Sequence, residues 1–315
     1  MFALQILLGF VLLIGSAEIL VRGAVALAHR IHVSPMIIGL TIVAYGTTMP
    51  ELVVSLEAAR NGAVGVAIGN VVGSNIANIL LILGIAAVIA PIPCEGRTMR
   101  REGVVAIFAA FLLAALALDG KLAPWHGIGM IALLVGLTFW SVRRDRRQRR
   151  LAAEISKEEL PKGPSSLPAA GGLLLGGLVG ILIGAPLLVD GAVTMAQILG
   201  VSDAVIGLTV VAVGTSLPEL ATAVVAARRG DPEVALGNIL GANTYNIMFI
   251  LGLVAIIAPV TIPPSIAGLD IWLMLIVTLV FAGSALLTGR TSRGLGIGFL
   301  LAYGAYTTYQ YTGAA

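Results

Sequence analysis

The sequence predicts an all-α membrane protein with ten transmembrane helices in two inverted five-helix repeats. Three observations support this fold class: the apolar composition, an internal repeat and the placement of the basic residues. Of the 315 residues, 58% are hydrophobic and 11% are charged, whereas about 25% of a typical soluble domain is charged. Aromatic residues are scarce and glycine is abundant. This composition is typical of closely packed membrane helices and not of a β-barrel with aromatic girdles.

The ten spans follow from runs of apolar residues. A hydrocarbon core of about 30 Å needs roughly 20 apolar residues per helix. The first run is longer than the apolar part of a secretion signal, so we interpret it as the first span. The predicted spans cover residues 3–27, 34–59, 65–90, 102–119, 124–142, 168–197, 203–227, 233–258, 268–287 and 294–312.

The basic residues predict the orientation. If alternate loops are assigned to one side, that side collects every one of the 19 lysines and arginines except Arg60 and Lys121. Loops rich in lysine and arginine stay in the cytoplasm, so both termini are expected outside. The protein is therefore predicted to be a multi-pass protein of the cell (inner) membrane. Because topology accounts for the positive charge, we do not expect a nucleic-acid partner.

The chain contains an internal repeat. A shift of 168 residues aligns residues 39–91 with 207–259 without a gap, and 29 of these 53 positions are identical. The best-matched segments are GLTIVAYGTTMPEL with GLTVVAVGTSLPEL, and IGNVVGSNIANILLILG with LGNILGANTYNIMFILG. Because each half has an odd number of spans, five, the second half inserts in the opposite orientation. Inverted repeats of this kind place a substrate site near the midplane of the membrane.

Three regions follow along the chain. Residues 1–142 form the first repeat, with its motif at 39–91, and residues 168–315 form the second, with its motif at 207–259. Residues 143–167, which begin with RRDRRQRR, are predicted to be a charged cytoplasmic linker that contacts anionic lipid head groups. The single cysteine, Cys94, excludes an intrachain disulfide and a thiolate metal cage.

Two glutamates are predicted at membrane depth, where charged groups are expensive and mark pathways or relays. Glu51 and Glu219 each end the pattern Gly-Thr-(Thr/Ser)-x-Pro-Glu. The glycine and proline weaken the helix and free backbone carbonyls, for instance those of Ala44 and Ala212. Such carbonyls are tolerated inside a membrane only when something satisfies them, and a cation does this.

Hydroxyl and amide side chains accompany the glutamates at helical spacing. Thr47 lies four residues before Glu51, and Thr215 lies four residues before Glu219, so their oxygens share a helix face. The candidate cation-binding residues are Glu51, Glu219, Thr47, Thr215, Ala44, Ala212, Ser74, Asn78, Asn246, Thr48 and Ser216.

Structural roles compete for several of these residues. The threonines can bond back to their own helix, and Ser74, Asn78 and Asn246 can instead join helices through hydrogen bonds. Asn70 and Asn238 are expected to cap helices. Arg22 is interpreted as an interface anchor with Glu18 as its partner one turn earlier. Glu57 is a weaker candidate for the access path.

The site composition favours a hard cation. The candidate ligands offer oxygen and no nitrogen or sulfur, and Ca²⁺ takes about 6–8 oxygen ligands in flexible geometry. The two carboxylates carry two negative charges, which one Ca²⁺, sodium ions or protons balance. Two bare carboxylates in a low dielectric are very costly. We therefore expect obligatory exchange of one cation for another, without a resident cofactor.

The paired motifs GTTMPE and GTSLPE, with GNVVGSNIAN and GNILGANTYN, resemble the α-repeats of the cation/Ca²⁺ antiporter superfamily, and in particular prokaryotic Na⁺/Ca²⁺ exchangers. The resemblance implies Ca²⁺ binding by Glu51 and Glu219 with Thr47 and Thr215. It also implies one sodium site that includes Ala44 and Ser74, and a second, symmetry-related sodium site that includes Ala212 and position 242. Spans one and six correspond to the sliding pair of the family.

Two positions depart from that pattern. Position 242 is alanine where these exchangers often carry serine, and Asn246 stands where many members carry aspartate. The asparagine resembles the potassium-independent branch, and the lost hydroxyl leaves room for proton coupling. The predicted function is Ca²⁺ extrusion driven by Na⁺, with Ca²⁺/H⁺ exchange and a cation channel as alternatives. No enzyme motif and no obligate protein partner is evident in the sequence.

Overall fold

The computed structural model describes residues 2–94, 97–156, 166–199, 212–258, 260–264 and 266–313. Within these ranges the chain is helical apart from short connections and two-residue strands, and π-helical turns are labelled η. The first half contains α1 (Phe2–Ile31), α2 (Pro35–Ile38), η1 (Gly39–Val43), α3 (Ala44–Thr47), α4 (Met49–Arg60), α5 (Val64–Ala77), η2 (Asn78–Leu83), α6 (Gly84–Ile89), β1 (Ile92–Pro93), α7 (Arg97–Ala117), β2 (Lys121–Leu122) and α8 (Pro124–Ser156). The second half contains α9 (Leu167–Ile198), α11 (Ala212–Gly214), α12 (Leu217–Arg229), α13 (Pro232–Tyr245), η4 (Asn246–Ile250), α14 (Leu251–Ile257), β3 (Val260–Thr261), η5 (Ile266–Asp270), α15 (Ile271–Thr288), β4 (Arg290–Thr291) and α16 (Arg293–Gly313).

The helices are those of a multi-pass membrane protein. Six of them are long and apolar enough to cross a membrane, and a bent pair, Pro35–Thr47 with Met49–Arg60, gives a seventh. Each of the ten predicted spans coincides with a helix or helix pair over its described part, and residues 203–211 lie outside that part. Membrane crossing by α7, α12 and α16 therefore stays a prediction.

The predicted weakening of the second span is confirmed. Thr48 separates α3 from α4, and the helix axis bends by 44° at this break. Pro50 is the second residue of α4, where its missing N–H costs no helical hydrogen bond. In the second half, Pro218 occupies the same place in α12, after a turn that follows α11.

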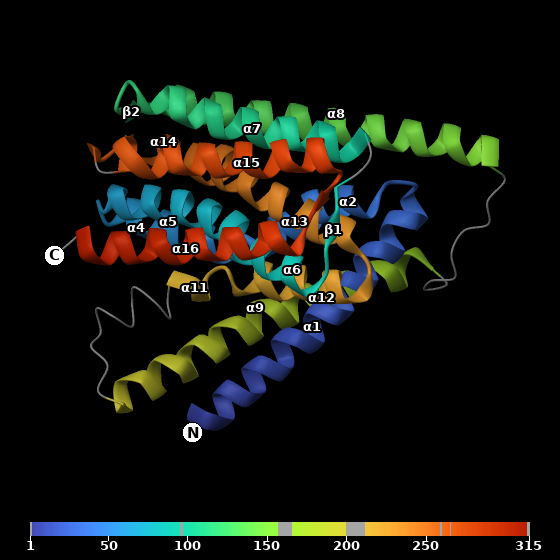
Figure 1. The fold of residues 1–315 in the computed structure, drawn as a ribbon, viewed down its shortest axis with the longest axis horizontal. Helices are drawn as coiled ribbons and strands as arrows, with labels where there is room; N and C mark the ends of the chain where they lie inside the picture. Colours follow the sequence, from blue (N-terminus) through green and yellow to red (C-terminus); the bar gives the residue numbers. More distant parts are fainter. Residues whose placement is uncertain are drawn as a thin grey trace.

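Two small strand pairs show how the halves are related. β1 pairs with β4, and β2 pairs with β3, both antiparallel. The 168-residue shift carries β1 onto β3 and Leu122 onto Arg290 of β4. The two pairs lie at opposite ends of the helix bundle (Figure 1). Each pair joins one half to the other, which is the arrangement that an inverted repeat produces.

Two long helices, α1 and α9, cross beside the remaining bundle (Figure 1). Glycines let their backbones meet. A Cβ added to Gly9 comes within 2.5 Å of the Leu188 backbone, and one added to Gly177 comes within 2.4 Å of the Leu20 backbone. These two contacts are equivalent under the 168-residue shift, so the crossing follows the symmetry of the repeat.

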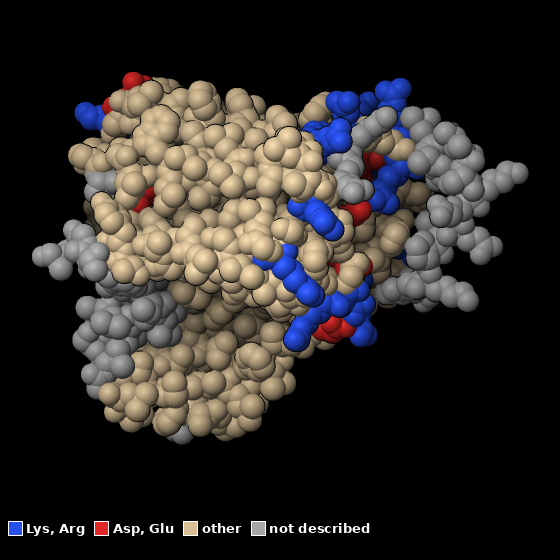
Figure 2. Space-filling model, in the orientation of Figure 1, with Lys and Arg blue, Asp and Glu red and all other residues tan. Residues whose placement is uncertain are grey.

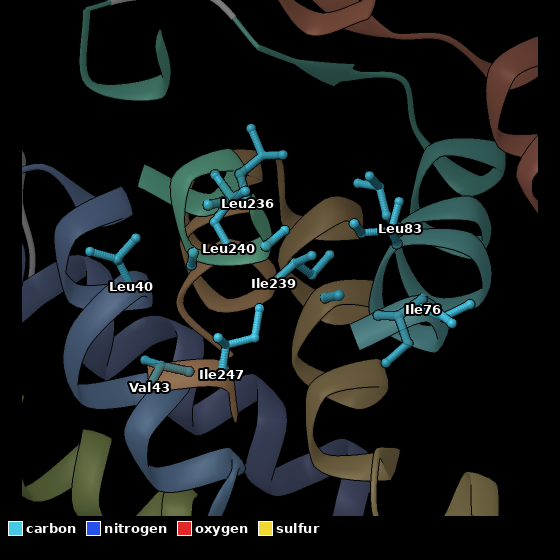
Figure 3. Close-up of a cluster of buried hydrophobic side chains, with 14 of the residues drawn as sticks. Leu40, Val43, Ile76, Leu83, Leu236, Ile239, Leu240 and Ile247 are labelled. Atoms are coloured by element: carbon cyan, nitrogen blue, oxygen red, sulfur yellow. The ribbon is translucent and has the colours of Figure 1, made fainter. Parts of the chain in front are cut away.

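The core lies where the motif helices of the two halves meet. Of the six helical spans, those at Val64–Ile89 and Pro232–Ile257 are the most enclosed, with 72% and 78% of their most apolar stretch buried, against 33% for α1. A helix that is apolar on all sides belongs inside a protein. The cluster joins α13 and η4 to η1, α5 and η2 (Figure 3). Its labelled members are Leu40, Val43, Ile76, Leu83, Leu236, Ile239, Leu240 and Ile247.

Positive charge gathers at one end of the molecule, which we call the basic end (Figure 2). It is the end at which β1 and β4 pair (Figure 1). The N-terminal end of α1 and the C-terminal end of α16 point toward the other end (Figure 1). This separation agrees with the predicted orientation, in which both termini are opposite the arginine-rich side.

The first half of the predicted linker is helical. Residues 143–156 continue α8 as helix, and the rest of the linker, to residue 165, lies outside the described residues. A 33-residue helix is about 50 Å long, which exceeds a hydrocarbon core of about 30 Å. The charged residues thus form a helical extension of the fifth span.

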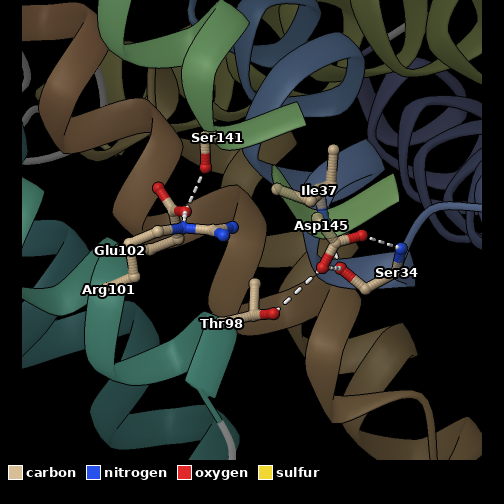
Figure 4. Close-up of polar contacts among 7 residues, drawn as sticks. All are labelled: Ser34, Ile37, Thr98, Arg101, Glu102, Ser141 and Asp145. Carbon is tan, nitrogen blue, oxygen red and sulfur yellow. Dashed lines mark hydrogen bonds and ion pairs between the residues drawn. The ribbon is translucent and has the colours of Figure 1, made fainter. Parts of the chain in front are cut away.

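Asp145 anchors this extension although it lies within the arginine run. Its carboxylate accepts hydrogen bonds from the Ser34 N–H at 2.7 Å, the Ser34 hydroxyl at 3.1 Å and the Thr98 hydroxyl at 3.0 Å (Figure 4). The Ser34 hydroxyl in turn accepts from the Ile37 N–H and caps α2. Asp145 therefore joins α8 to α2 and α7.

Equivalent acidic residues join the fourth and fifth helices of each half. Glu102 on α7 accepts hydrogen bonds from Ser141 on α8 and from the adjacent Arg101 (Figure 4). Asp270, 168 positions later, accepts from Tyr306 at 3.1 Å and from Gln310 at 2.6 Å, both on α16. The sequence comparison did not single out this pair, because the two residues lie outside the aligned motifs.

Candidate cation site

Glu51 and Glu219 lie in the first turn of α4 and of α12, directly after the two helix breaks. Their side chains are 1% and 0% exposed. The first turn of a helix presents N–H groups without helical partners and the positive end of the helix dipole. The breaks therefore put each carboxylate at the helix position that tolerates negative charge best.

The second half of the chain contacts the first of the two glutamates. Ser216, from the second half, donates a hydrogen bond of 3.2 Å to Glu51 Oε1. Ser216 thus brings the second half into contact with Glu51, and a cation site shared by both glutamates stays a prediction.

Three of the four carboxylate oxygens lack a hydrogen-bond partner within the described parts of the chain. They are Glu51 Oε2 and both oxygens of Glu219, all of them buried. Among the described residues no lysine, arginine or histidine forms an ion pair with either glutamate. A buried ionised carboxylate is costly unless it is paired or coordinates a metal. These oxygens therefore call for a cation or a proton.

The hydroxyls of the first motif are buried but partly engaged. Thr48 donates to the Ala44 carbonyl at 3.0 Å, and Thr47 lies 3.3 Å from the same carbonyl and 3.1 Å from Asn238 Oδ1. The bond back to the helix, an alternative for Thr47, is thus present. The expectation that the Ala44 carbonyl is unsatisfied is wrong, because the Thr48 N–H and hydroxyl both donate to it. Its place among the ligands stays a prediction.

The second motif is described less completely. Ala212 begins α11, and Thr215 lies in the turn before α12 and is partly exposed, whereas Ser216 is buried. The chain from residue 200 to 211, which includes the start of the second motif, lies outside the described residues. The two glutamates are alike in burial and helix position, but Thr48 bonds back to Ala44 whereas Ser216 bonds to Glu51. The symmetry of the two ligand sets stays a prediction.

Four asparagines form a symmetric network across the interface of the halves. Asn75 Nδ2 donates to the Asn243 carbonyl at 3.3 Å, and Asn243 Nδ2 donates to the Asn75 carbonyl at 3.2 Å. Asn78 Nδ2 donates to Asn243 Oδ1 at 2.9 Å, and Asn246 Nδ2 donates to Asn75 Oδ1 at 3.0 Å. The 168-residue shift carries each bond onto its mate. The helix-joining role predicted as an alternative for Asn78 and Asn246 is therefore present.

The same two side chains also keep a free acceptor. Asn78 Oδ1 and Asn246 Oδ1 are buried and have no hydrogen-bond partner within the described residues. Each asparagine opens a π-helical turn, η2 or η4, and such turns are frequent at functional sites. Ser74 is buried on α5, one turn before Asn78. A joining role and a ligand role thus use different atoms of the same amide.

Some functional contacts were missed from the sequence. Asn75 and Asn243 were not singled out, although both are identical under the repeat shift. The capping role expected for Asn70 and Asn238 is wrong, since both lie inside helices. Asn70 instead donates to the Glu51 carbonyl at 3.2 Å. Exact repetition of an amide inside an apolar helix was the signal that could have revealed these residues.

The remaining predicted polar residues lie apart from these groups. Glu18 and Arg22 form the expected pair on α1, and Glu18 also pairs with Arg229 of α12. Glu57 is exposed on α4, and a role in the access path stays a prediction. No group of three or more histidine, cysteine, aspartate or glutamate residues that could hold a metal occurs in the described ranges. The predicted donors are two carboxylates with hydroxyls and amides, a set of hard oxygens that suits Ca²⁺ better than softer metals.

Known proteins match the chain over nearly its whole length. The sodium/calcium exchanger protein family matches residues 1–143 and 169–312. The inner membrane protein YrbG of Escherichia coli is 37% identical over 304 residues, which cover 95% of this chain and 93% of that protein. The sodium/calcium exchanger MaX1 of Methanosarcina acetivorans is 33% identical, with 82% and 84% covered. A solved structure of the sodium-calcium exchanger NCX_Mj superposes with a TM-score of 0.84 at 32% identity, covering 98% of this chain and 97% of that one.

Proposed function

This chain belongs to the sodium/calcium exchanger protein family, and on that premise we propose that it extrudes Ca²⁺ from the cytosol in exchange for Na⁺ by alternating access. Members of this family are transporters and not enzymes. In our proposal Glu51 and Glu219 hold the cation together at the centre of the membrane. The protein resides in the inner cell membrane with its basic end in the cytoplasm.

One observation carries the proposal. Three buried carboxylate oxygens, contributed by both halves, have no hydrogen-bond partner in the described structure. Leaving such groups ionised and unpaired costs several kcal/mol per ion. A bound divalent cation removes this cost by neutralising both charges at once. The N-termini of α4 and α12 add to the stability of the two carboxylates, because the positive end of a helix dipole favours negative charge.

The ligand set combines carboxylate, hydroxyl, amide and backbone oxygens. Its members are Glu51, Glu219, Thr47, Thr215, Ala44, Ala212, Ser74, Asn78, Asn246, Thr48 and Ser216. Ca²⁺ accepts 6–8 such oxygens at about 2.3–2.6 Å without strict geometry. The unpartnered Oδ1 atoms of Asn78 and Asn246 support the inclusion of these two amides.

Coupling follows from charge. An empty site carries two buried carboxylates, so a carrier without a cation reorients slowly, whereas a carrier loaded with Ca²⁺ or with Na⁺ reorients freely. Movement of α1 and α9 relative to the bundle exposes the site on alternate sides. The glycine contacts between these helices support movement of α1 and α9 as one unit, because the two backbones lie in direct contact at the crossing.

Ca²⁺/H⁺ exchange is the second candidate. Position 242 is a buried alanine, so the second half lacks the hydroxyl that Ser74 provides in the first. Fewer oxygen ligands weaken a sodium site, while each glutamate can still exchange a proton for Ca²⁺. In this alternative the same two carboxylates carry the driving ion.

Flux measurements in proteoliposomes distinguish the candidates. Uptake of isotope-45 calcium is measured under an imposed Na⁺ gradient, an imposed pH gradient, or neither. We expect uptake to require the Na⁺ gradient. Uptake that needs the pH gradient and ignores Na⁺ establishes Ca²⁺/H⁺ exchange, and equal passive flux without any exchangeable cation contradicts antiport and favours a channel.

A further inference from the structure

The Asn75 and Asn243 side chains cross between the halves at the point where the two candidate amide ligands begin their π-helical turns. We propose that these two asparagines are positioning residues, which fix the Asn78 and Asn246 amides so that their Oδ1 atoms stay available to the cation. This inference rests on the function proposed above and adds two residues to it.

The first step concerns the direction of an amide. Asn78 has one NH₂ group and one oxygen on the same planar group. Its Nδ2 donates to Asn243 Oδ1 at 2.9 Å, so the oxygen is turned away from Asn243. That oxygen is buried and has no hydrogen-bond partner in the described structure. The partner on the other half therefore decides which end of the Asn78 amide is free.

The second step is that the partner is itself held. Asn243 Oδ1 accepts from Asn78, while Asn243 Nδ2 donates to the Asn75 carbonyl at 3.2 Å. With the NH₂ group engaged by a backbone carbonyl, the Asn243 amide cannot flip without losing both bonds. Asn75 is fixed in the same way by the Asn243 carbonyl, and it holds Asn246. The two side chains that orient Asn78 and Asn246 are thus each held by a backbone carbonyl of the opposite half.

The third step concerns the helices that carry the carboxylates. The turn η2, which Asn78 opens, packs against α12, the helix that carries Glu219. The turn η4, which Asn246 opens, packs against α4, the helix that carries Glu51. Residues that orient a metal ligand typically change metal affinity by about 10- to 100-fold when they are removed.

The test uses the full-length protein purified in detergent, with Ca²⁺ alone as the probe. The midpoint temperature of thermal unfolding is followed against Ca²⁺ concentration. Because the stabilisation grows as RT ln(1 + c/Kd), where c is the Ca²⁺ concentration, a fit of its rise gives the Ca²⁺ concentration that equals the apparent Kd. We expect Asn243→Leu to raise this concentration about 10- to 100-fold. Thr244→Val is the matched control on the same helix, because the Thr244 hydroxyl only bonds back to the Leu240 carbonyl. We expect it to leave this concentration unchanged.

A double-mutant cycle separates positioning from general damage. If Asn243 acts through Asn78, the double variant Asn243→Leu with Asn78→Leu binds Ca²⁺ no more weakly than the weaker single variant. The combination of Asn243→Leu with Asn246→Leu misplaces the Asn78 ligand and removes the Asn246 ligand, so it is expected to multiply the two losses. If the losses of Ca²⁺ affinity multiply in both double variants alike, the proposal is overturned.

The remaining outcomes are also decisive. Wild-type protein that Ca²⁺ does not stabilise refutes the proposed function itself. Stabilised wild type with Asn78→Leu impaired and Asn243→Leu unchanged refutes only the positioning role. If Asn243→Leu does not fold, its mirror Asn75→Leu gives the same test through Asn246. Failure of both variants to fold assigns the crossed pair a structural role and overturns the inference.

Discussion

A single carboxylate, Asp145, shows how residue context overrides residue type. It lies in the most basic segment of the chain, RRDRRQRR, yet it is buried and accepts three hydrogen bonds from α2 and α7. Its neighbours Arg143, Arg144, Arg146 and Arg147 are exposed. Asp145 is thus buried in the helical extension of α8, while the four arginines beside it are exposed.

Replacing this carboxylate is expected to loosen the basic end. Asp145→Ala removes the acceptor of three hydrogen bonds and leaves the Ser34 and Thr98 donors without it. Hydrogen bonds to charged groups contribute about 1.5–3 kcal/mol each, so we expect a loss of at least about 2 kcal/mol of stability. Thermal unfolding in detergent measures it. Arg146→Ala, one residue away and exposed, is the control, and an equal loss in both variants contradicts this role.

The residues of the candidate site were predictable to different degrees. Glu51 and Glu219 stood out because a charged residue repeated within a helix-breaking motif is rare at membrane depth. Asn75 and Asn243 did not, because their contribution consists of contacts 168 residues apart in the sequence. The partners of the Ala44 carbonyl depend on the rotamers of Thr48, which the sequence does not specify.

At the scale of elements, the crossing of α1 and α9 depends on glycines on one face of each helix. Gly177 faces the Leu20 backbone, whereas its neighbour Gly176 has no atom within 4 Å of an added Cβ. Two adjacent glycines therefore differ only in the face of the helix on which they lie. This pair offers a matched test of the crossing.

Gly177→Ala is expected to force the two helices apart. The added methyl group comes within 2.4 Å of a backbone nitrogen, which no side-chain rotation relieves. We expect a lower unfolding temperature and a reduced rate of Ca²⁺ transport. Gly176→Ala is expected to preserve both properties. Similar behaviour of the two variants contradicts a close-packed crossing of α1 and α9.

Helix boundaries were predicted less well than helix positions. The break before α4 was expected from Gly46 and Pro50, and the structure has it at Thr48. The continuation of α8 to Ser156 was not expected, because the end of an apolar run marks the membrane boundary and not the helix end. Helix propensity remains high through arginine and alanine residues, so the helix proceeds beyond the bilayer.

At the scale of the whole molecule, inversion explains why one sequence motif serves both membrane faces. The strand pairs β1–β4 and β2–β3 lie at opposite ends of the bundle (Figure 1), and positive charge is concentrated at the β1–β4 end (Figure 2). The positive-inside rule predicts that this end faces the cytoplasm. The direction of the inverted repeat in the membrane stays a prediction from the sequence.

Cysteine labelling tests this orientation. In a Cys94→Ser background, Arg146→Cys places a thiol at the basic end, and Asn61→Cys places one in the exposed connection between α4 and α5. A membrane-impermeant maleimide applied to intact cells is expected to label Asn61→Cys only. In inside-out vesicles it is expected to label Arg146→Cys only. The reverse pattern contradicts a cytoplasmic basic end.

The central claim is that both repeats contribute a carboxylate to one cation. Isothermal titration of the purified protein with Ca²⁺ tests it most directly, using Glu51→Gln, Glu219→Gln and the exposed Glu57→Gln as a control. Each of the first two variants retains the size of the side chain and loses one of the two charges, so we predict that each abolishes Ca²⁺ binding while the control binds as wild type does. Binding of Ca²⁺ with wild-type affinity by either Glu51→Gln or Glu219→Gln would contradict the account.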